Sequence, residues 1–127
     1  MEYPEKVFEI FQNPKNIGEI KDADAVGKVG NPTCGDLMWL YLKIDKKEGK
    51  EIIKDVKVKT FGCVAAVATS SILTEMIKGK TIEEAMKITK DDITNELGGL
   101  PKQKVHCSVL ALDAFKDAIE KYRSKSK

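Results

Sequence analysis

The chain has 127 residues, of which 42% are hydrophobic and 33% charged, and its 22 basic and 20 acidic side chains leave a net charge of +2. This size and composition predict one domain, residues 1–127, around a single hydrophobic core. The two signs of charge are interspersed, so we expect neither nucleic acid nor a membrane surface as a partner. No window approaches the roughly 18 apolar residues of a membrane span, and residues 1–6 (MEYPEK) lack an apolar signal core. These features predict a cytoplasmic protein.

The first third of the chain predicts one helix followed by mostly irregular chain. Pro4 suits a first helical turn, and an apolar stripe ends at Asn13 and Pro14, which predicts a short helix from Pro4 to Gln12. The stripe consists of Val7, Phe8 and Phe11. Residues 15–30 are rich in small, polar and glycine residues, with one short strand expected from Ala25 to Lys28.

Two alternating segments predict an antiparallel hairpin. In the strand from Leu37 to Ile44, every second side chain is apolar and should face the core. Residues 45–50 (DKKEGK) form the reversing turn, and the partner strand runs from Ile53 to Phe61. The expected inner positions are Met38, Leu40, Leu42, Ile44, Val56, Val58 and Thr60.

The second half of the chain predicts helices. An alanine- and serine-rich helix should run from Val64 to Lys78 and end at Gly79. Two capping boxes, Thr81 with Glu84 and Thr89 with Asp92, start short helices that end near Lys87 and Leu97. A long last helix begins at Cys107 or Ser108 and reaches about Arg123. The predicted fold class is α+β, a small antiparallel sheet of about three strands with helices packed on one face and a long C-terminal helix.

All three cysteines stand at the edge of a predicted element. An odd number of cysteines fits reduced thiols that bind metal or do chemistry better than a disulfide framework. Cys63 and Cys107 lie at helix starts, where the partial positive charge of the helix favours a thiolate. Cys34 lies in a glycine and proline loop with Asp36 two residues on, and His106 precedes Cys107. Soft thiolates with one imidazole or carboxylate suit an iron–sulfur cluster or zinc rather than magnesium or calcium.

The residues alone leave other interpretations open. The three thiols could be buried packing groups, His106 could cap the last helix, and Asp36 could be a turn residue. A cysteine hydrolase or thiol oxidoreductase that uses Cys107 with His106 is a further possibility. It is disfavoured because adjacent residues at a helix start point in divergent directions.

Three segments together resemble the IscU-type iron–sulfur cluster assembly scaffold, which is related to the N-terminal domain of NifU. They are residues 30–36 (GNPTCGD), 59–63 (KTFGC) with the following helix start, and 106–111 (HCSVLA). Residues 5–7, 13–18 and 78–81 extend the likeness over essentially the whole chain. The resemblance implies a single scaffold domain without turnover of its own.

The resemblance also implies the ligands and partners. Cys34, Cys63 and Cys107 would hold a nascent [2Fe-2S] cluster, with Asp36 or His106 as the fourth ligand. Asp36 would keep the cluster labile, which agrees with the poorer match of a hard carboxylate to the cluster. A cysteine desulfurase of the IscS or NifS type would pass persulfide sulfur to Cys107, and apo iron–sulfur proteins would receive the cluster.

Further expectations concern groups around the cluster. Lys104 occupies the place of a family lysine near the ligands, although a plain solvated lysine fits the sequence as well. Zinc suits the same ligands, and a homo-oligomer could share the cluster.

Two departures from the family pattern matter. Residues 100–104 read LPKQK, where members served by an Hsp70-type chaperone carry LPPVK, which argues against chaperone-driven release. Val64 replaces a common glycine and should stiffen the turn beside Cys63. The alternative is a zinc-binding sulfur acceptor resembling the SufU group. That group carries an insertion before the last motif and generally lacks the histidine, so the uninterrupted segment from Gly99 to Cys107 and His106 favour the scaffold.

Overall fold

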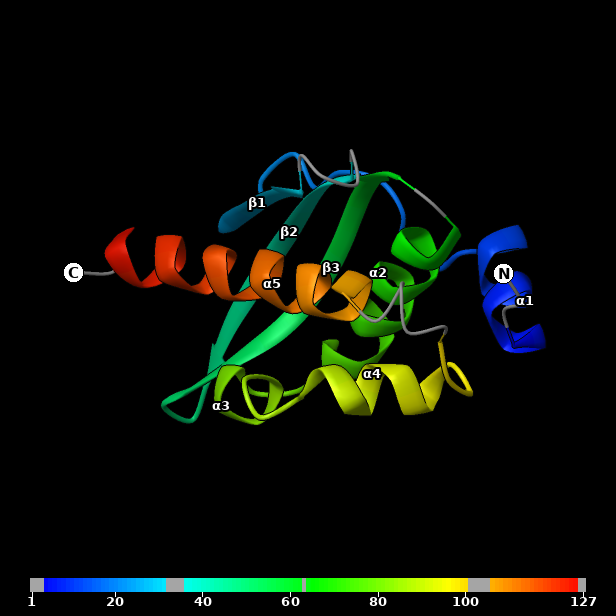
Figure 1. The fold of residues 1–127 in the computed structure, drawn as a ribbon. Coiled ribbons are helices and arrows are strands. Elements are labelled where there is room, and N and C mark those ends of the chain that lie inside the picture. The colour runs from blue at the N-terminus through cyan, green and yellow to red at the C-terminus, as the bar shows by residue number, and fades with distance from the viewer. Residues whose placement is uncertain (1–3, 32–35, 63, 101–105, 126–127) are drawn as a thin grey trace.

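The computed structural model describes residues 4–31, 36–62, 64–100 and 106–125, and within these ranges a three-stranded antiparallel sheet carries helices on one face (Figure 1). This confirms the predicted fold class. The elements in chain order are α1 (Glu5–Gln12), β1 (Ala25–Asn31), β2 (Asp36–Lys47), β3 (Lys50–Phe61), α2 (Val64–Ile77), α3 (Ile82–Ala85), α4 (Lys90–Glu96) and α5 (His106–Lys125).

The sheet has the order β1-β2-β3, and the alternation predicted from the sequence sets its two faces. Met38, Leu40 and Leu42 of β2 are fully buried beneath the helices, as are Val56 and Val58 of β3. Ile44, expected on the same face, is only partly buried because a register shift falls between Lys43 and Ile44. The strand predicted from Ala25 to Lys28 is longer, since β1 pairs with β2 as far as Asn31.

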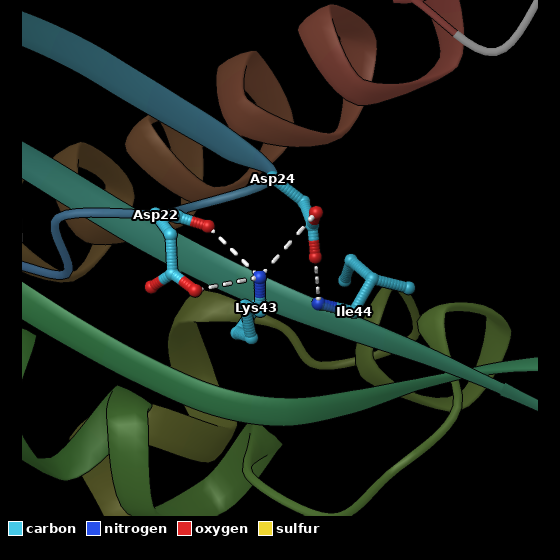
Figure 2. Close-up of polar contacts among 4 residues, drawn as sticks. All are labelled: Asp22, Asp24, Lys43 and Ile44. Carbon is cyan, nitrogen blue, oxygen red and sulfur yellow. Dashed lines mark hydrogen bonds and ion pairs between the residues drawn. The ribbon is translucent and has the colours of Figure 1, made fainter.

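A carboxylate pair just before β1 stabilises the bulged part of β2 (Figure 2). Asp24 Oδ2 accepts the backbone N–H of Ile44 at 2.6 Å. The Lys43 ammonium lies 3.2 Å from Asp22 Oδ2 and also donates to the Asp22 carbonyl at 2.9 Å. The hydrogen bond from the Lys43 ammonium to the Asp22 carboxylate lowers the pKa of Asp22. The start of β1 is therefore tied to β2 by side chains as well as by the ladder.

The hairpin turn is tighter than expected. Glu48 and Gly49 both have positive φ, 52° and 78°, as the two central residues of a type I′ turn do. β2 and β3 extend on either side of them, and Lys47 pairs with Lys50. The predicted six-residue turn over residues 45–50 is thus a two-residue turn.

The helices begin and end close to the predicted residues. Both capping boxes are present, with Thr81 and Glu84 at α3 and Thr89 and Asp92 at α4. Gly79 follows α2 with φ of 86°. The predicted apolar stripe of α1 is only partly buried. Val7 is buried, whereas Phe8 and Phe11 are 44% and 41% exposed.

The two long helices lie differently on the sheet. α5 lies across the sheet over β1 and β2, and α2 packs on β3 (Figure 1). The apolar side chains of α5 recur at helical spacing and are buried on one face, at Leu110, Ala114, Phe115, Ala118 and Ile119. No helix in the described ranges is both long and apolar enough to cross a membrane.

Candidate metal centre

The three segments expected to carry the ligands are described to different extents. Cys34, Cys63 and Lys104 lie outside the described residues. Asp36 is the first residue of β2 and His106 the first residue of α5, and for both the backbone is described. Cys107 is the one cysteine with a described side chain. Within the described ranges no three metal-ligating side chains come together to hold a metal ion, and of the five proposed ligands only Cys107 has a described side chain there.

The flanks of the first two segments meet at one end of the sheet. Asn31 pairs with Asp36, on either side of the segment that contains Cys34. The next residue of β2, Leu37, pairs with Phe61, the last residue of β3, which is followed by Gly62 and Cys63. Backbone pairing therefore brings the chain beside Cys34 next to the chain before Cys63.

Cys107 joins these segments through the helices. Its side chain is 0% exposed and forms a small apolar cluster with Ala65 and Ala66, which Leu100 adjoins. The two alanines belong to the first turn of α2, which directly follows Cys63 in the chain. The start of α5 thus packs against the start of α2.

The two helix starts at this place share an electrostatic property. The first turns of α2 and α5 contain no acidic residue, whereas those of α3 and α4 each contain two. A carboxylate in the first turn would offset the partial positive charge of a helix N-terminus. At α2 and α5 that charge is left to favour a neighbouring thiolate, which is the form that binds metal.

Buried hydroxyls connect α2 to its neighbours, a feature that the sequence analysis missed. Thr69 Oγ1 lies 3.1 Å from the Ala66 carbonyl and 3.3 Å from the Cys107 carbonyl. The Ser70 hydroxyl lies 3.0 Å from that of Thr60 on β3. One signal was available in the sequence, because residues 69–71 (TSS) form a hydroxyl-rich run inside the predicted alanine- and serine-rich helix.

The solvent face of the sheet beside these segments is aromatic and basic. Leu37 and Phe61 are 40% and 55% exposed. The Trp39 and Phe61 rings form a T-shaped pair with centroids 5.8 Å apart. Lys28 Nζ lies 5.4 Å from the Trp39 ring centroid, and Lys59 Nζ lies 5.9 Å from that of Phe61. The hydrogen bond from Lys59 to Glu19 raises the pKa of Lys59.

The arrangement is chemically suited to binding a soft metal. A thiol next to a helix start, with no carboxylate in the first turn, can contribute a thiolate ligand. Of the five proposed ligands, the structure places the Cys107 side chain and the backbones of Asp36 and His106.

Comparison with known proteins identifies a family and named relatives. Residues 2–127 match the family described as NifU-like N terminal domain. The iron–sulfur cluster assembly scaffold protein IscU 1 of Archaeoglobus fulgidus is 60% identical over 124 residues, which cover 98% of this chain and 78% of that protein. The IscU scaffold protein of Aquifex aeolicus is 50% identical with the same coverages.

A solved structure shares the fold at lower identity. The crystal structure of FiSufU of Fervidobacterium islandicum, whose name assigns it as an iron–sulfur cluster assembly scaffold protein for the SUF system, has a TM-score of 0.72 and 26% identity, covering 92% of this chain and 96% of that one. Since the family match spans nearly every residue, the chain belongs to the NifU-like N terminal domain family.

Proposed function

We propose that this protein is a scaffold on which a [2Fe-2S] cluster is assembled from iron and desulfurase-derived sulfur and from which it is transferred to apo-proteins. The observation that carries the proposal is the packing of Cys107 against Ala65 and Ala66, because it joins the last predicted ligand segment to the helix that follows Cys63. The 60% identity to a protein named as an IscU scaffold supports the same function.

Cys34, Cys63 and Cys107 are the proposed thiolate ligands, and Asp36 or His106 completes the set. A carboxylate in the fourth position would make the cluster easier to release, which a scaffold requires. Lys104 is proposed to pair with Asp36 or with an unligated thiolate before metal arrives. Zinc fits the same donors and would compete with the cluster.

Sulfur is proposed to arrive as a persulfide on a cysteine desulfurase of the IscS or NifS type. The Cys107 thiolate attacks the outer persulfide sulfur, a new S–S bond forms on Cys107, and the desulfurase leaves as a thiolate. This exchange is redox-neutral. Each transferred sulfur then needs two electrons from an external reductant to become the sulfide of the cluster. Cys107 is itself modified in this step, so the protein acts as a sulfur acceptor and is not expected to turn over as an enzyme.

The setting of this function is also part of the proposal. Apo iron–sulfur proteins in the cytoplasm are the proposed acceptors. Release is proposed not to need an Hsp70-type chaperone, because residues 100–104 read LPKQK. Two chains could share one cluster as a homo-oligomer.

A zinc-binding sulfur acceptor of the SufU kind is the alternative. Two relatives named as IscU iron–sulfur cluster assembly scaffolds, 60% and 50% identical, favour the cluster scaffold.

The test is the metal content of protein purified without oxygen. Iron, zinc and acid-labile sulfide would be measured with the visible spectrum for the wild type, Cys107→Ala and the control Val109→Ala, which changes a half-exposed side chain in the same turn of α5. We expect equimolar iron and sulfide with cluster absorption in the wild type and control, and loss of both in Cys107→Ala. Zinc without sulfide, even after supply of iron and a desulfurase, would instead favour the sulfur acceptor.

A further inference from the structure

We propose that Thr69 is a positioning residue for Cys107. The Thr69 hydroxyl holds the first turn of α5 against α2 and thereby controls when the Cys107 thiol becomes accessible. The inference deepens the proposed function and rests on it, because accessibility matters only if Cys107 receives sulfur or metal. Thr69 itself is not a ligand in the proposed set.

The geometry gives Thr69 two acceptors. Its side chain is fully buried on α2. Oγ1 lies 3.1 Å from the Ala66 carbonyl, one turn earlier in the same helix, and 3.3 Å from the Cys107 carbonyl in α5. A hydroxyl has one proton to donate, so the two carbonyls share it. The bond to Cys107 is the one that links the two helices.

The Cys107 carbonyl does not need this bond for its own satisfaction. It lies at the start of α5, where helix geometry directs the N–H of Ala111 to it, and a carbonyl oxygen accepts two hydrogen bonds. Loss of the Thr69 hydroxyl therefore leaves no buried carbonyl without a partner. The expected effect is a local loosening of α5 from α2 rather than global destabilisation.

The surroundings of Cys107 make such loosening consequential. Its side chain is 0% exposed and packs on Ala65 and Ala66, the small residues at the start of α2. The thiol must become exposed before a sulfur donor or a metal ion can reach it, and separation of the first turn of α5 from α2 would expose it. The Thr69 hydrogen bond opposes this separation, and the Thr94 and Ser108 hydroxyls, 3.2 Å apart, hold the same turn to α4.

The test is the rate at which iodoacetamide alkylates Cys107 in metal-free, reduced, full-length protein, resolved by peptide mass spectrometry. Thr69→Val keeps nearly the same shape without the hydroxyl, and Thr69→Ser keeps the hydroxyl. Thr74→Val is the matched control, because Thr74 is an equally buried α2 residue whose hydroxyl is hydrogen-bonded to the Asn16 side chain and the Ser71 carbonyl. A urea unfolding curve of each variant measures any global effect.

We expect Thr69→Val to accelerate alkylation about fivefold. A typical hydrogen bond contributes about 1 kcal/mol net, and its loss changes the equilibrium for opening of the first turn by that factor. Thr69→Ser and Thr74→Val should stay near the wild-type rate once corrected for global stability. The proposal would be overturned if Thr69→Val were alkylated at the wild-type rate, or if Thr69→Ser were alkylated as fast as Thr69→Val. An equal acceleration in Thr74→Val would also overturn it.

A second readout separates this inference from the proposed function. If the wild type holds a cluster, its visible circular dichroism should change in Thr69→Val and return in Thr69→Ser, because the ligand at the start of α5 is held less firmly. If the wild type holds no cluster, the proposed function fails by metal analysis, whereas the alkylation rates still decide whether Thr69 holds the turn.

Discussion

Gly27 shows how one absent side chain places a whole helix. A Cβ at this position would lie 2.0 Å from the Ala114 carbonyl oxygen and 2.7 Å from the Ala118 backbone nitrogen. Both are backbone atoms of α5, so no side-chain rotation could relieve the clash. Gly27 therefore permits the close approach of the middle of α5 to β1, and α5 carries Cys107 in its first turn.

Gly27→Ala should destabilise the fold by about 3 kcal/mol, since overpacking against backbone forces the helix to move. Gly49→Ala is the control, because a Cβ there meets nothing within 4 Å and adds only the strain of φ 78°, about 1 kcal/mol. Urea unfolding of both variants measures the difference. Equal losses would mean that α5 can shift at little cost.

Asp36→Ala should slow transfer of a loaded cluster to an apo-ferredoxin several-fold, because the proposed carboxylate ligand is the weakest link to the cluster. The measurement is the appearance of holo-ferredoxin by circular dichroism. Asp45→Ala, toward the other end of β2, serves as control and should transfer like the wild type. Transfer from Asp36→Ala at the wild-type rate would remove the proposed role of Asp36 in lability.

At the scale of elements, α5 also protects the edge of the sheet. β1 is an edge strand, and the backbone N–H of Lys28 donates to Asp117 Oδ2 on α5 at 2.9 Å. Lys121 Nζ lies 2.9 Å from the same oxygen. These two bonds lower the pKa of Asp117, the backbone bond most. The open edge of β1 is thus covered by α5, which supplies the Asp117 carboxylate as a hydrogen-bond acceptor.

The lowered pKa makes this contact dependent on pH. Its stabilisation is complete above the ordinary pKa of an aspartate, near 4, and is lost as pH falls through the lower folded value. Asp117→Asn should be less stable than the wild type by about 1 kcal/mol at pH 7, and the gap should close below about pH 4.

Thermal unfolding between pH 2 and 7 would measure this, with Asp113→Asn, an exposed position one turn earlier on α5, as control. A gap that persists unchanged at pH 2 would contradict the assignment.

Helices and strands whose bounds depend on neighbouring residues in the sequence could be predicted from the sequence. Both capping boxes, the glycine after α2 and the alternation in β2 and β3 predicted those elements to within a few residues. Features that depend on contacts between distant residues were not readable. The bulge at Ile44 depends on Asp24, and the exposure of Phe8 and Phe11 depends on how α1 sits on α2, so neither leaves a local signal.

For the molecule as a whole, the proposed ligands come from segments far apart in the sequence. The described flanks of these segments lie at the end of the sheet and at the starts of α2 and α5, where Leu37 pairs with Phe61 and Cys107 packs on Ala65. The ligand candidates are implied by the resemblance of three sequence segments to the IscU-type scaffold. The contact of Thr69 with the Cys107 carbonyl could not be foreseen, because 38 residues separate the two positions.

Binding at such a place should stabilise the whole fold, because a metal that joins distant segments binds the folded chain better than the unfolded one. Zinc added in excess to metal-free protein should raise the melting temperature by several degrees, and Cys107→Ala should abolish most of the rise. The control Val109→Ala should respond as the wild type does. A melting temperature that zinc leaves unchanged in the wild type would argue against a site made of these segments.

Trp39 gives the protein an internal fluorophore. It is the single tryptophan of the chain, lies in β2 three residues from Asp36, and contacts the Phe61 ring and the Lys28 ammonium. An iron–sulfur chromophore bound at this end of the sheet would quench the indole emission by energy transfer. Loading and unloading could therefore be followed in real time by intrinsic fluorescence, without a label and without altering any proposed ligand.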